Sequence, residues 1–416
     1  MKHELALNGG KKVVSDELER FQHPIIDPSI ASVVLNQLHT SISLYDNGGI
    51  YSDLESGLKE VFKLDNVLTT NSGTTALFSL FYGFDFSLGD NVIVPSYTFF
   101  ATAAPLIALG VQLRFADCLT DNGNVDPQNI RKKIDANTKG IIITHMWGIP
   151  CDMEDILKIG IEYGIPVLED ASHAHLAEYD GKIIGSFSDG AAWSLQGKKN
   201  LTAGEGGMLT SRDKRVMERA VIAGHFNKRA KQEVFEPDLI PFAITGSGYN
   251  FRMHPLGASI AYHQLNELKN QTKERREVAA FIASQIDQIE GLSNPRIPNS
   301  SKPAWYAYPI LFDNNAFSNV SINEFVRAIN AEGAIEADIP GSTGSLGRFE
   351  LFNNPQKINR MYSGTEYVSP SPSDFKNAEF FSSKMFKIPT WYGTKRFKFA
   401  EAYLEAIKKV AKYYKK

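Results

Sequence analysis

The chain has 416 residues, of which 43% are hydrophobic and 22% charged, as in an ordinary water-soluble globular protein. This length exceeds what a single hydrophobic core usually supports, so two domains are expected. A formal net charge of −3 argues against nucleic acids or anionic membranes as partners. Cys118 and Cys151 are too few for a disulfide framework, and the N-terminus lacks a signal-peptide-like apolar segment, so a cytoplasmic location is expected.

The N-terminal region is predicted to be an arm that leads into helices. Pro24 and Pro28 disfavour a helix in residues 23–29, so this part of the arm should be extended. The residue pattern predicts helices at 30–38 and around 53–62, followed by a short strand at 67–69.

Residues 71–77, NSGTTAL, join that strand to an apolar helix through a turn of small residues. The first amides of a helix have no partners within it, and the helix dipole adds partial positive charge there, so a phosphate is stabilised at such a turn. Gly73, Thr74 and Thr75 are therefore candidate phosphate ligands. The alternative is that Ser72 or Thr74 merely caps the helix, as in most such turns.

Residues 91–113 carry no charge and are long enough to span a bilayer. Pro95 and Pro105 interrupt this stretch, however, and polar residues cluster between them. A buried strand at 92–94, a turn and a buried helix explain the pattern better than a membrane span.

Strands and helices then alternate along the chain. Apolar runs predict strands at 112–115, 140–145 and 165–168. This alternation predicts an α/β fold with a parallel sheet covered by helices on both sides. A helix is predicted at 152–164, and its apolar face comprises Met153, Ile156, Ile159, Gly160 and Tyr163.

Asp170 and Lys199 are the candidates for the central chemistry. Asp170 follows the strand at 165–168, at the sheet edge where ligands of such folds bind. Lys199 comes 29 residues later, before the glycine-rich turn 204–207. This combination suits pyridoxal phosphate, because the lysine forms a Schiff base and the acid keeps the ring nitrogen protonated. Composition does not separate Lys199 from its neighbour Lys198, and the alternative is that both are solvated loop charges.

The pattern changes after residue 270. A long polar helix is predicted at 273–289, a strand at 305–312, and a helix that opens with a capping box at 321–324 and stops at Gly333. A last helix at 397–414 completes a smaller α+β domain. The predicted domains are an N-terminal arm (1–30), a large domain (31–270) and a small C-terminal domain (271–416).

Five segments together resemble the DegT/DnrJ/EryC1/StrS family of sugar and cyclitol aminotransferases. They occur in the order of the family and span most of the chain up to residue 270. The resemblance implies the fold-type I architecture of pyridoxal phosphate-dependent transferases, with a mainly parallel central sheet flanked by helices and a smaller C-terminal α+β domain. The segments are NSGTTAL (71–77), PSYTFFAT (95–102), EDASHAH (169–175), SLQGKKNLTAGEGG (194–207) and YNFRM (249–253).

The resemblance also assigns roles to individual residues. The family places its Schiff-base lysine before an Asn-Leu-Thr-like step and five residues after a serine, which identifies Lys199 and makes Ser194 a phosphate ligand. It implies that Asp170 pairs with the pyridinium nitrogen, that His173 lies near the ring, and that Phe99 stacks on the ring.

The same resemblance supports the phosphate role of the turn formed by Gly73, Thr74 and Thr75. It implies that Asn250 reaches the cofactor phosphate of the neighbouring subunit in a homodimer. The alternative is that Asn250 caps the helix expected at 253–268. His145 and His175 are weaker candidates, as core residues or as neighbours of the site.

The activity implied is that of a ping-pong aminotransferase. Glutamate or glutamine would convert pyridoxal 5'-phosphate to pyridoxamine 5'-phosphate, which would then aminate a keto sugar, nucleotide-linked in many relatives, or a keto-cyclitol. The segments ALNGG (6–10) and LGRFELFNNP (346–355) and the HAH triplet lean slightly toward the branch acting on inososes and aminohydroxybenzoate precursors.

Other functions stay open. Pyridoxamine-dependent sugar dehydratases replace the lysine with histidine, so Lys199 argues against one, and a lyase like aminohydroxybenzoate synthase is a further alternative. A non-catalytic partner subunit could retain the fold, although Lys199, Asp170 and Ser194 are all present. A nicotinamide-binding fold would need G-x-G-x-x-G after a strand, which the sequence lacks.

Overall fold

The computed structural model describes residues 4–15, 21–26, 28–362 and 367–415. Its centre is a sheet of seven strands, in spatial order β1 (Leu68–Thr70), β10 (Gly207–Ser211), β9 (Gly190–Ser194), β6 (Val167–Asp170), β5 (Thr138–Thr144), β2 (Asn91–Pro95) and β4 (Gln112–Ala116). The five strands from β9 to β4 are parallel. β10 is antiparallel to both of its neighbours, so β1 runs in the same direction as the parallel strands. The predicted α/β fold with a mainly parallel sheet is confirmed.

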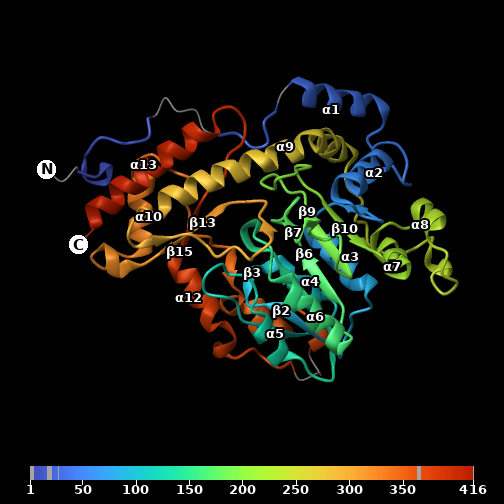
Figure 1. Cartoon of the computed structure of the whole chain (residues 1–416). Coiled ribbons are helices and arrows are strands. Elements are labelled where there is room, and N and C mark those ends of the chain that lie inside the picture. Colours follow the sequence, from blue (N-terminus) through green and yellow to red (C-terminus); the bar gives the residue numbers. More distant parts are fainter. Residues whose placement is uncertain (1–3, 16–20, 27, 363–366, 416) are drawn as a thin grey trace.

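Helices cover both faces of this sheet (Figure 1). Side chains alternate along each strand, so Val92 and Val94 belong to one core and Ile93 belongs to another. The first core is completed by helices α3 (Gly73–Gly83), α4 (Ala104–Ala108) and α7 (Lys214–Gly224). The second is completed by α2 (Ile50–Phe62), α5 (Pro127–Lys133), α6 (Met153–Tyr163) and the first half of α9 (Pro255–Ile286).

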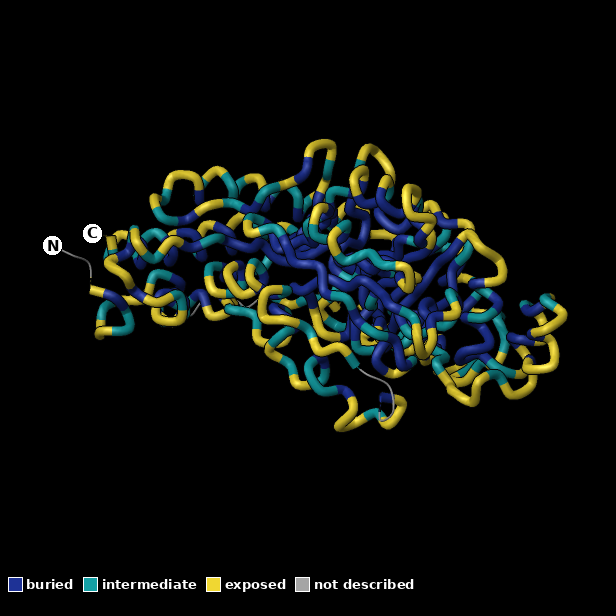
Figure 2. Tube along the Cα trace, turned by 90° about the horizontal axis from the view of Figure 1, so that it is seen from below, coloured by how far each residue is buried: buried dark blue, intermediate teal, exposed yellow. Residues whose placement is uncertain are grey.

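A third core lies at the other end of α9. With 32 residues, α9 is about 48 Å long. It passes from the large sheet to a three-stranded antiparallel sheet of β11 (Leu292–Ser293), β13 (Tyr308–Phe312) and β15 (Met385–Ile388). Helices α10 (Ile322–Ala331) and α13 (Arg396–Tyr414) contribute to the same core. Buried segments run continuously through the middle of the molecule, with exposed residues on its rims (Figure 2).

A late part of the chain returns to the large sheet. Phe352 of α11 (Glu350–Asn353) and Phe381 of α12 (Lys376–Lys384) belong to the same core as Phe115 of β4. The predicted division at residue 270 falls inside the continuous helix α9. The domain limits therefore stay a prediction, and Phe352 and Phe381 pack in the core of the predicted large domain.

The remaining strands form small antiparallel pairings around these cores. β3 pairs with β14, and β12, β7 and β8 form a second short sheet. Their bounds, with those of the two remaining α-helices, are α1 (Pro28–Thr40), β3 (Tyr97–Phe99), β7 (Glu178–Tyr179), β8 (Lys182–Ile183), α8 (Lys228–Glu233), β12 (Ser301–Lys302) and β14 (Thr343–Ser345).

Some predicted boundaries were wrong. The sequence predicts two helices, at 253–268 and 273–289, but neither Gly nor Pro interrupts residues 264–272, and the structure has the single helix α9. α1 begins at Pro28, which was expected in the extended arm, because proline is favourable in the first turn of a helix. Tyr163 was expected on the buried face of α6, but it is the last residue of that helix and is 45% exposed.

The uncharged stretch 91–113 is explained by core elements. It contains β2 and β3, both extended, and the short helix α4, whose residues Leu106 and Ile107 are buried in the first core. Within the described ranges, no helix combines the length and the apolar character that crossing a membrane requires.

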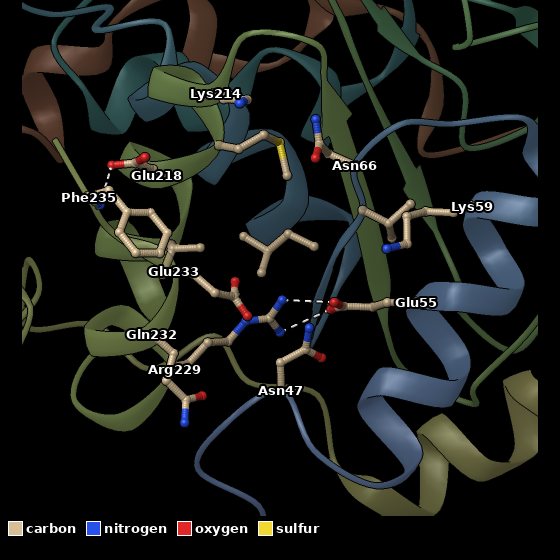
Figure 3. Close-up of a pocket in the computed structure, with 14 residues that line it drawn as sticks. Asn47, Glu55, Lys59, Asn66, Lys214, Glu218, Arg229, Gln232, Glu233 and Phe235 are labelled. Atoms are coloured by element: carbon tan, nitrogen blue, oxygen red, sulfur yellow. Dashed lines mark hydrogen bonds and ion pairs between the residues drawn. The ribbon is translucent and has the colours of Figure 1, made fainter.

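One buried ion pair links α8 to α2 beside a cavity of about 370 Å³ (Figure 3). Arg229 is only 4% exposed, and its Nη1 and Nη2 donate to the Glu55 carboxylate at 3.0 and 2.8 Å. Its Nε donates to Glu233 at 3.1 Å. Glu55 also accepts hydrogen bonds from the amide and hydroxyl of Thr69 in β1. The guanidinium thus connects two helices and the edge of the sheet.

We expect Arg229→Met to destabilise the protein by about 3–5 kcal/mol, because it leaves Glu55 buried without its counter-charge. The unfolding midpoint in urea and in thermal scans measures this loss. Arg215→Met is the matched control, since Arg215 also contacts two acids, Glu236 and Asp238, but at a site that is 44% exposed. Equal losses for the two variants would contradict the prediction.

Candidate functional site

Polar and small residues from four elements meet at the carboxyl edge of the large sheet. Thr144 ends β5, Asp170 ends β6 and Ser194 ends β9. Because β1 runs in the same direction as these strands, the helix that follows it, α3, begins at the same edge. All these positions line one cavity of about 430 Å³. The topology therefore brings together residues that are up to 121 positions apart, from Gly73 to Ser194.

The N-terminus of α3 opens into this cavity. Ser72 is its N-cap and accepts a hydrogen bond from the Thr75 amide at 3.1 Å, while the Thr75 hydroxyl accepts one from the Ser72 amide at 3.2 Å. Gly73 and Thr74 line the cavity, and their amides donate to no other group of the described residues. A Cβ on Gly73 would lie 2.6 Å from Ser194 Cβ, so only glycine allows this close approach.

The capping interpretation of the turn is confirmed at Ser72, and the phosphate interpretation stays a prediction. Ser72 caps the helix, and the hydroxyl of Thr75 is occupied by this capping box instead of facing the cavity. Gly73 and Thr74 provide the two free amides that a phosphate requires. The role of all three residues as phosphate ligands stays a prediction.

Asp170 is a buried carboxylate held by two donors. It is 4% exposed, and its Oδ2 accepts a hydrogen bond from Thr102 Oγ1 at 2.6 Å. Its Oδ1 accepts one from the Ser172 amide at 3.1 Å. Thr102 is a residue that the sequence patterns did not single out, although it lies in the motif 95–102. The two bonds fix the direction in which the carboxylate faces the cavity.

Lys199 lies in the loop between β9 and β10, which is anchored by distant parts of the chain. The Asn200 side chain donates to the Ala304 carbonyl at 2.9 Å. His23 Nε2 lies 2.7 Å from the Lys199 carbonyl oxygen, so the N-terminal arm holds this loop directly. Burial lowers the pKa of His23 to about 4, and the neutral ring donates from Nε2 to that carbonyl.

The environment of Lys199 differs from that of Lys198. Burial lowers the pKa of Lys199 to about 8, and the negative charge of Asp170 partly opposes this shift. Lys199 Nζ lies 4.5 Å from the centre of the Tyr306 ring. Lys198 also lines the cavity, but its side chain is exposed. Lys199 therefore has more neutral amine at physiological pH than a lysine with the ordinary pKa.

His173 is part of a stack of rings beside Lys199. Its ring is nearly parallel to that of Tyr306, with centroids 4.1 Å apart and an interplanar angle of 9°, and the Trp147 ring lies 5.7 Å from His173 and 6.4 Å from Tyr306. Burial, and then the charge of Lys199, lowers the pKa of His173 well below its usual value, so the ring is neutral. Tyr306 comes from a separate part of the chain, and no sequence motif indicated it.

Phe99 borders the cavity at the end of β3. It is 36% exposed, and its strand pairs with β14, where Thr343 is its partner. The Phe100 ring lies 4.4 Å from that of Phe99, and stacking of Phe99 on a cofactor ring stays a prediction.

Like Thr75, Asn250 is a predicted cofactor residue that does not line the cavity. It is exposed, and its Oδ1 accepts a hydrogen bond from the Arg252 amide at 3.2 Å. The alternative that Asn250 caps the next helix was wrong, because α9 begins at Pro255 and its N-cap is His254. An exposed position outside its own cavity leaves Asn250 free to reach another subunit.

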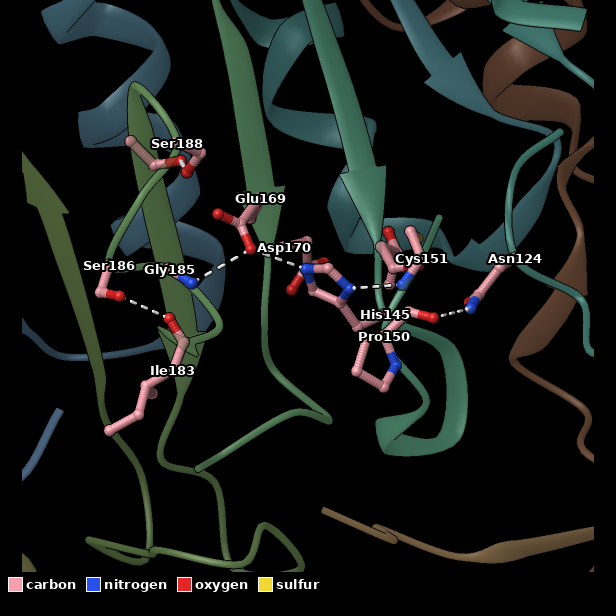
Figure 4. Close-up of polar contacts among 12 residues, drawn as sticks. Asn124, His145, Pro150, Cys151, Glu169, Asp170, Ile183, Gly185, Ser186 and Ser188 are labelled. Carbon is pink, nitrogen blue, oxygen red and sulfur yellow. Dashed lines mark hydrogen bonds and ion pairs between the residues drawn. The ribbon is translucent and has the colours of Figure 1, made fainter. Parts of the chain in front are cut away.

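The surroundings of His145 and His175 indicate structural roles for both residues. The Cys151 amide donates to His145 Nδ1 at 3.0 Å, and His145 Nε2 then donates to Glu169 at 2.7 Å (Figure 4). His175 is buried without a partner for either ring nitrogen, and burial lowers its pKa to about 3. In the part of the chain that the structure describes, no group of His, Cys, Asp and Glu side chains suits a metal ion.

Known proteins are similar to this chain in sequence and in architecture. The model of the DegT/DnrJ/EryC1/StrS aminotransferase family matches residues 29–401. The dTDP-3-amino-3,6-dideoxy-alpha-D-galactopyranose transaminase of Aneurinibacillus thermoaerophilus is 31% identical over 268 residues, which are 64% of this chain and 70% of that protein. The putative L-glutamine:3-amino-2,3-dideoxy-scyllo-inosose aminotransferase of Streptomyces kanamyceticus is 28% identical over 368 residues, or 85% of this chain and 83% of that protein.

A solved structure has the same fold over nearly the whole chain. The aminotransferase from Psychrobacter cryohalolentis superposes with a TM-score of 0.81 at 24% identity, covering 94% of this chain and 98% of that chain. The predicted family resemblance is confirmed by the family match. The chain belongs to the DegT/DnrJ/EryC1/StrS family of pyridoxal phosphate-dependent aminotransferases.

Proposed function

We propose that this enzyme transfers an amino group from glutamate or glutamine to a keto sugar, carried on a nucleotide, or to a keto-cyclitol. The observation that carries the proposal is the pair formed by Lys199 and Asp170 in one cavity. The amine has a pKa lowered to about 8, and the carboxylate is fixed by two hydrogen bonds. A nucleophilic amine and a permanent anion at the opposite side of a flat ring are what this chemistry needs.

The residues present fit pyridoxal phosphate. The free amides of Gly73 and Thr74, with the Ser194 side chain next to them, suit its phosphate. Asp170 suits the ring nitrogen, because a buried anion stabilises the protonated form of a pyridine. Phe99 and His173 offer flat faces for the ring itself. The cofactor, when bound, supplies the electron sink for bond changes at the amino-bearing carbon.

Each residue then has a distinct task. Lys199 Nζ would hold the cofactor by its aldehyde group and, once displaced by substrate, would move the proton at the reacting substrate carbon. Asp170 holds the proton of the ring nitrogen. His173 has no positive charge, so it packs beside the ring without competing with Lys199 as a proton donor.

Two relatives support the acceptor class. One is named for a dTDP-linked amino sugar and the other for a scyllo-inosose, and both acceptors are polyhydroxylated six-membered rings. The wider coverage, 85% of this chain, belongs to the cyclitol relative. We therefore propose a polyhydroxylated cyclic ketone as the common chemical class.

The principal test is the reaction of purified enzyme with pyridoxal phosphate and a donor. The protein should become yellow, and the visible band should disappear when glutamate or glutamine is added. Lys199→Ala should lower the rate of this half-reaction at least about a thousandfold, because it removes both nucleophile and proton carrier. A visible band that no donor bleaches would favour a dehydratase, and no binding of the cofactor would refute the proposal.

The pKa of Lys199 gives a prediction for the cofactor-free protein. Above a pH of about 8 the Lys199 amine is neutral, so its labelling by formaldehyde and borohydride should rise to a plateau with a midpoint there. Asp170→Asn should move this midpoint lower, because the anion favours the charged amine. Peptide mass spectrometry across a pH series measures both profiles, with N-acetyl-lysine as reference. A Lys199 profile identical to that of the reference would contradict the prediction.

We further propose a homodimer in which Asn250 completes the neighbouring site. Several apolar side chains are exposed near Asn250, including Phe242, Ile244 and Tyr249, at 53%, 62% and 52%. Exposed apolar clusters of this kind are typical of subunit interfaces. Neither the phosphate turn nor the cavity includes Asn250 of the same chain, which fits a role in trans.

Mixed dimers test this arrangement. Lys199→Ala and Asn250→Ala homodimers should both be impaired, but a hybrid of the two contains one site with both native residues. Unfolding and refolding an equal mixture should therefore restore activity to about a quarter of the native value per subunit. Size-exclusion chromatography confirms dimer formation. If Asn250 acted within its own chain, no hybrid site would be intact and no activity would return.

A further inference from the structure

Two arginines are buried in the described ranges, and they differ in how their charges are compensated. Arg229 and Arg275 are each 4% exposed. Arg229 is bound by the carboxylates of Glu55 and Glu233. Arg275 forms an ion pair with no carboxylate of the described residues, and its polar contacts are all neutral. A buried charge without a counter-charge is unfavourable, so Arg275, which has none among the described residues, is a candidate binding group for an anion.

The guanidinium of Arg275 has one occupied and one unoccupied edge. Nη1 donates to the carbonyl and the hydroxyl oxygen of Thr390 at 2.6 and 3.1 Å. Nη2 has only His23 Nδ1 at 3.5 Å, and Nε has no partner. The Tyr392 ring lies 4.8 Å from Cζ and supports the group from one face. Nε is buried, and with Nη2 it makes up the edge through which a guanidinium can engage a carboxylate by two parallel hydrogen bonds.

Arg275 borders a second cavity of about 490 Å³. Burial lowers the pKa of Arg275 to about 10, so the group stays charged at neutral pH. The neutral His23 ring also lines this cavity. Its charged lining residues are three cations and two acids, which leaves one net positive charge: Lys198, Arg275, Lys387, Glu336 and Asp338.

This second cavity adjoins the cavity of about 430 Å³ that is lined by Lys199 and Asp170. Tyr306 lines both, and its ring lies 4.5 Å from Lys199 Nζ. Lys198, Asp338 and Lys387 are also shared between the two. A small molecule that reacts at Lys199 can therefore extend past Tyr306 toward Arg275.

We propose that Arg275 binds a carboxylate of the amino-acid donor. This assignment rests on the proposed aminotransferase function and names the group that selects its donor. A single net positive charge matches one carboxylate, whereas the diphosphate of a nucleotide carries at least two negative charges. The planar guanidinium edge also matches the geometry of a carboxylate.

The donor half-reaction of the cofactor-loaded enzyme is the first test. Arg275→Gln should raise the KM for glutamate roughly thirtyfold, because two charge-assisted hydrogen bonds are lost, with a much smaller change in kcat. Arg275→Lys should be intermediate, since it keeps the charge without the two-pronged geometry. Reaction with hydroxylamine, which has no carboxylate, should be unchanged in both variants. Arg327→Gln, at an exposed arginine of α10, is the matched control.

Binding of glutarate is the second test, and it does not depend on turnover. Calorimetry should detect glutarate binding to the native protein, no binding of the neutral glutaramide, and a similar thirtyfold loss of glutarate affinity in Arg275→Gln. If Arg275→Gln does not fold, Arg275→Lys and the comparison of glutarate with glutaramide decide the question. Unchanged donor KM and unchanged glutarate affinity in the Arg275 variants would overturn the proposal.

A nucleoside diphosphate provides the remaining comparison. If Arg275→Gln loses affinity for dTDP or GDP but retains it for glutarate, the arginine binds the acceptor and the donor assignment is wrong. The experiments can also refute the aminotransferase function and the carboxylate site independently of each other. A protein that binds glutarate through Arg275 but does not react with any donor would refute the aminotransferase function and leave the carboxylate site intact.

Discussion

The buried carboxylate of Asp170 and the amine of Lys199 share one cavity, and their charges act on each other. Burial alone would push Lys199 far toward its neutral form, whereas the anion of Asp170 draws it back, and the balance is a pKa of about 8. Asp170 can act in this way only because Thr102 and the Ser172 amide hold it in place. The position of one carboxylate therefore governs both the nucleophile and the proposed ring contact.

Strand direction explains why these groups meet. The ends of β5, β6 and β9 lie at one edge because the strands are parallel, and the antiparallel β10 turns the chain so that β1 and α3 join them. The Lys199 loop is then held from outside this sheet, by Ala304 and by His23 of the N-terminal arm. One hydrogen bond therefore connects the arm directly to the backbone of Lys199.

The contrast between the two buried arginines follows from the same electrostatic rule. Arg229 has two carboxylates and joins two helices, whereas Arg275 has none among the described residues and borders a cavity next to Lys199. Burial removes water from both guanidinium groups, which is unfavourable. Among the described residues, carboxylates offset this cost only for Arg229. The second cavity also connects the chemistry to the small sheet, because Lys387 of β15 lines both cavities.

The sequence alone determined the α/β class, most strands of the large sheet and the family, because apolar periodicity and glycine-rich turns are local properties. It also selected the Lys199, Asp170, Gly73 and Ser194 set, through motifs matched to the family. The tertiary structure alone revealed the positions of Thr102, Tyr306 and Arg275, because side chains distant in sequence become neighbours there. It also gave a physical reason for the choice of Lys199 that the family motif had made, namely burial and a nearby anion. Packing likewise determined that α9 is a single helix. The polar middle of its sequence has no apolar periodicity that continues from one core to the other.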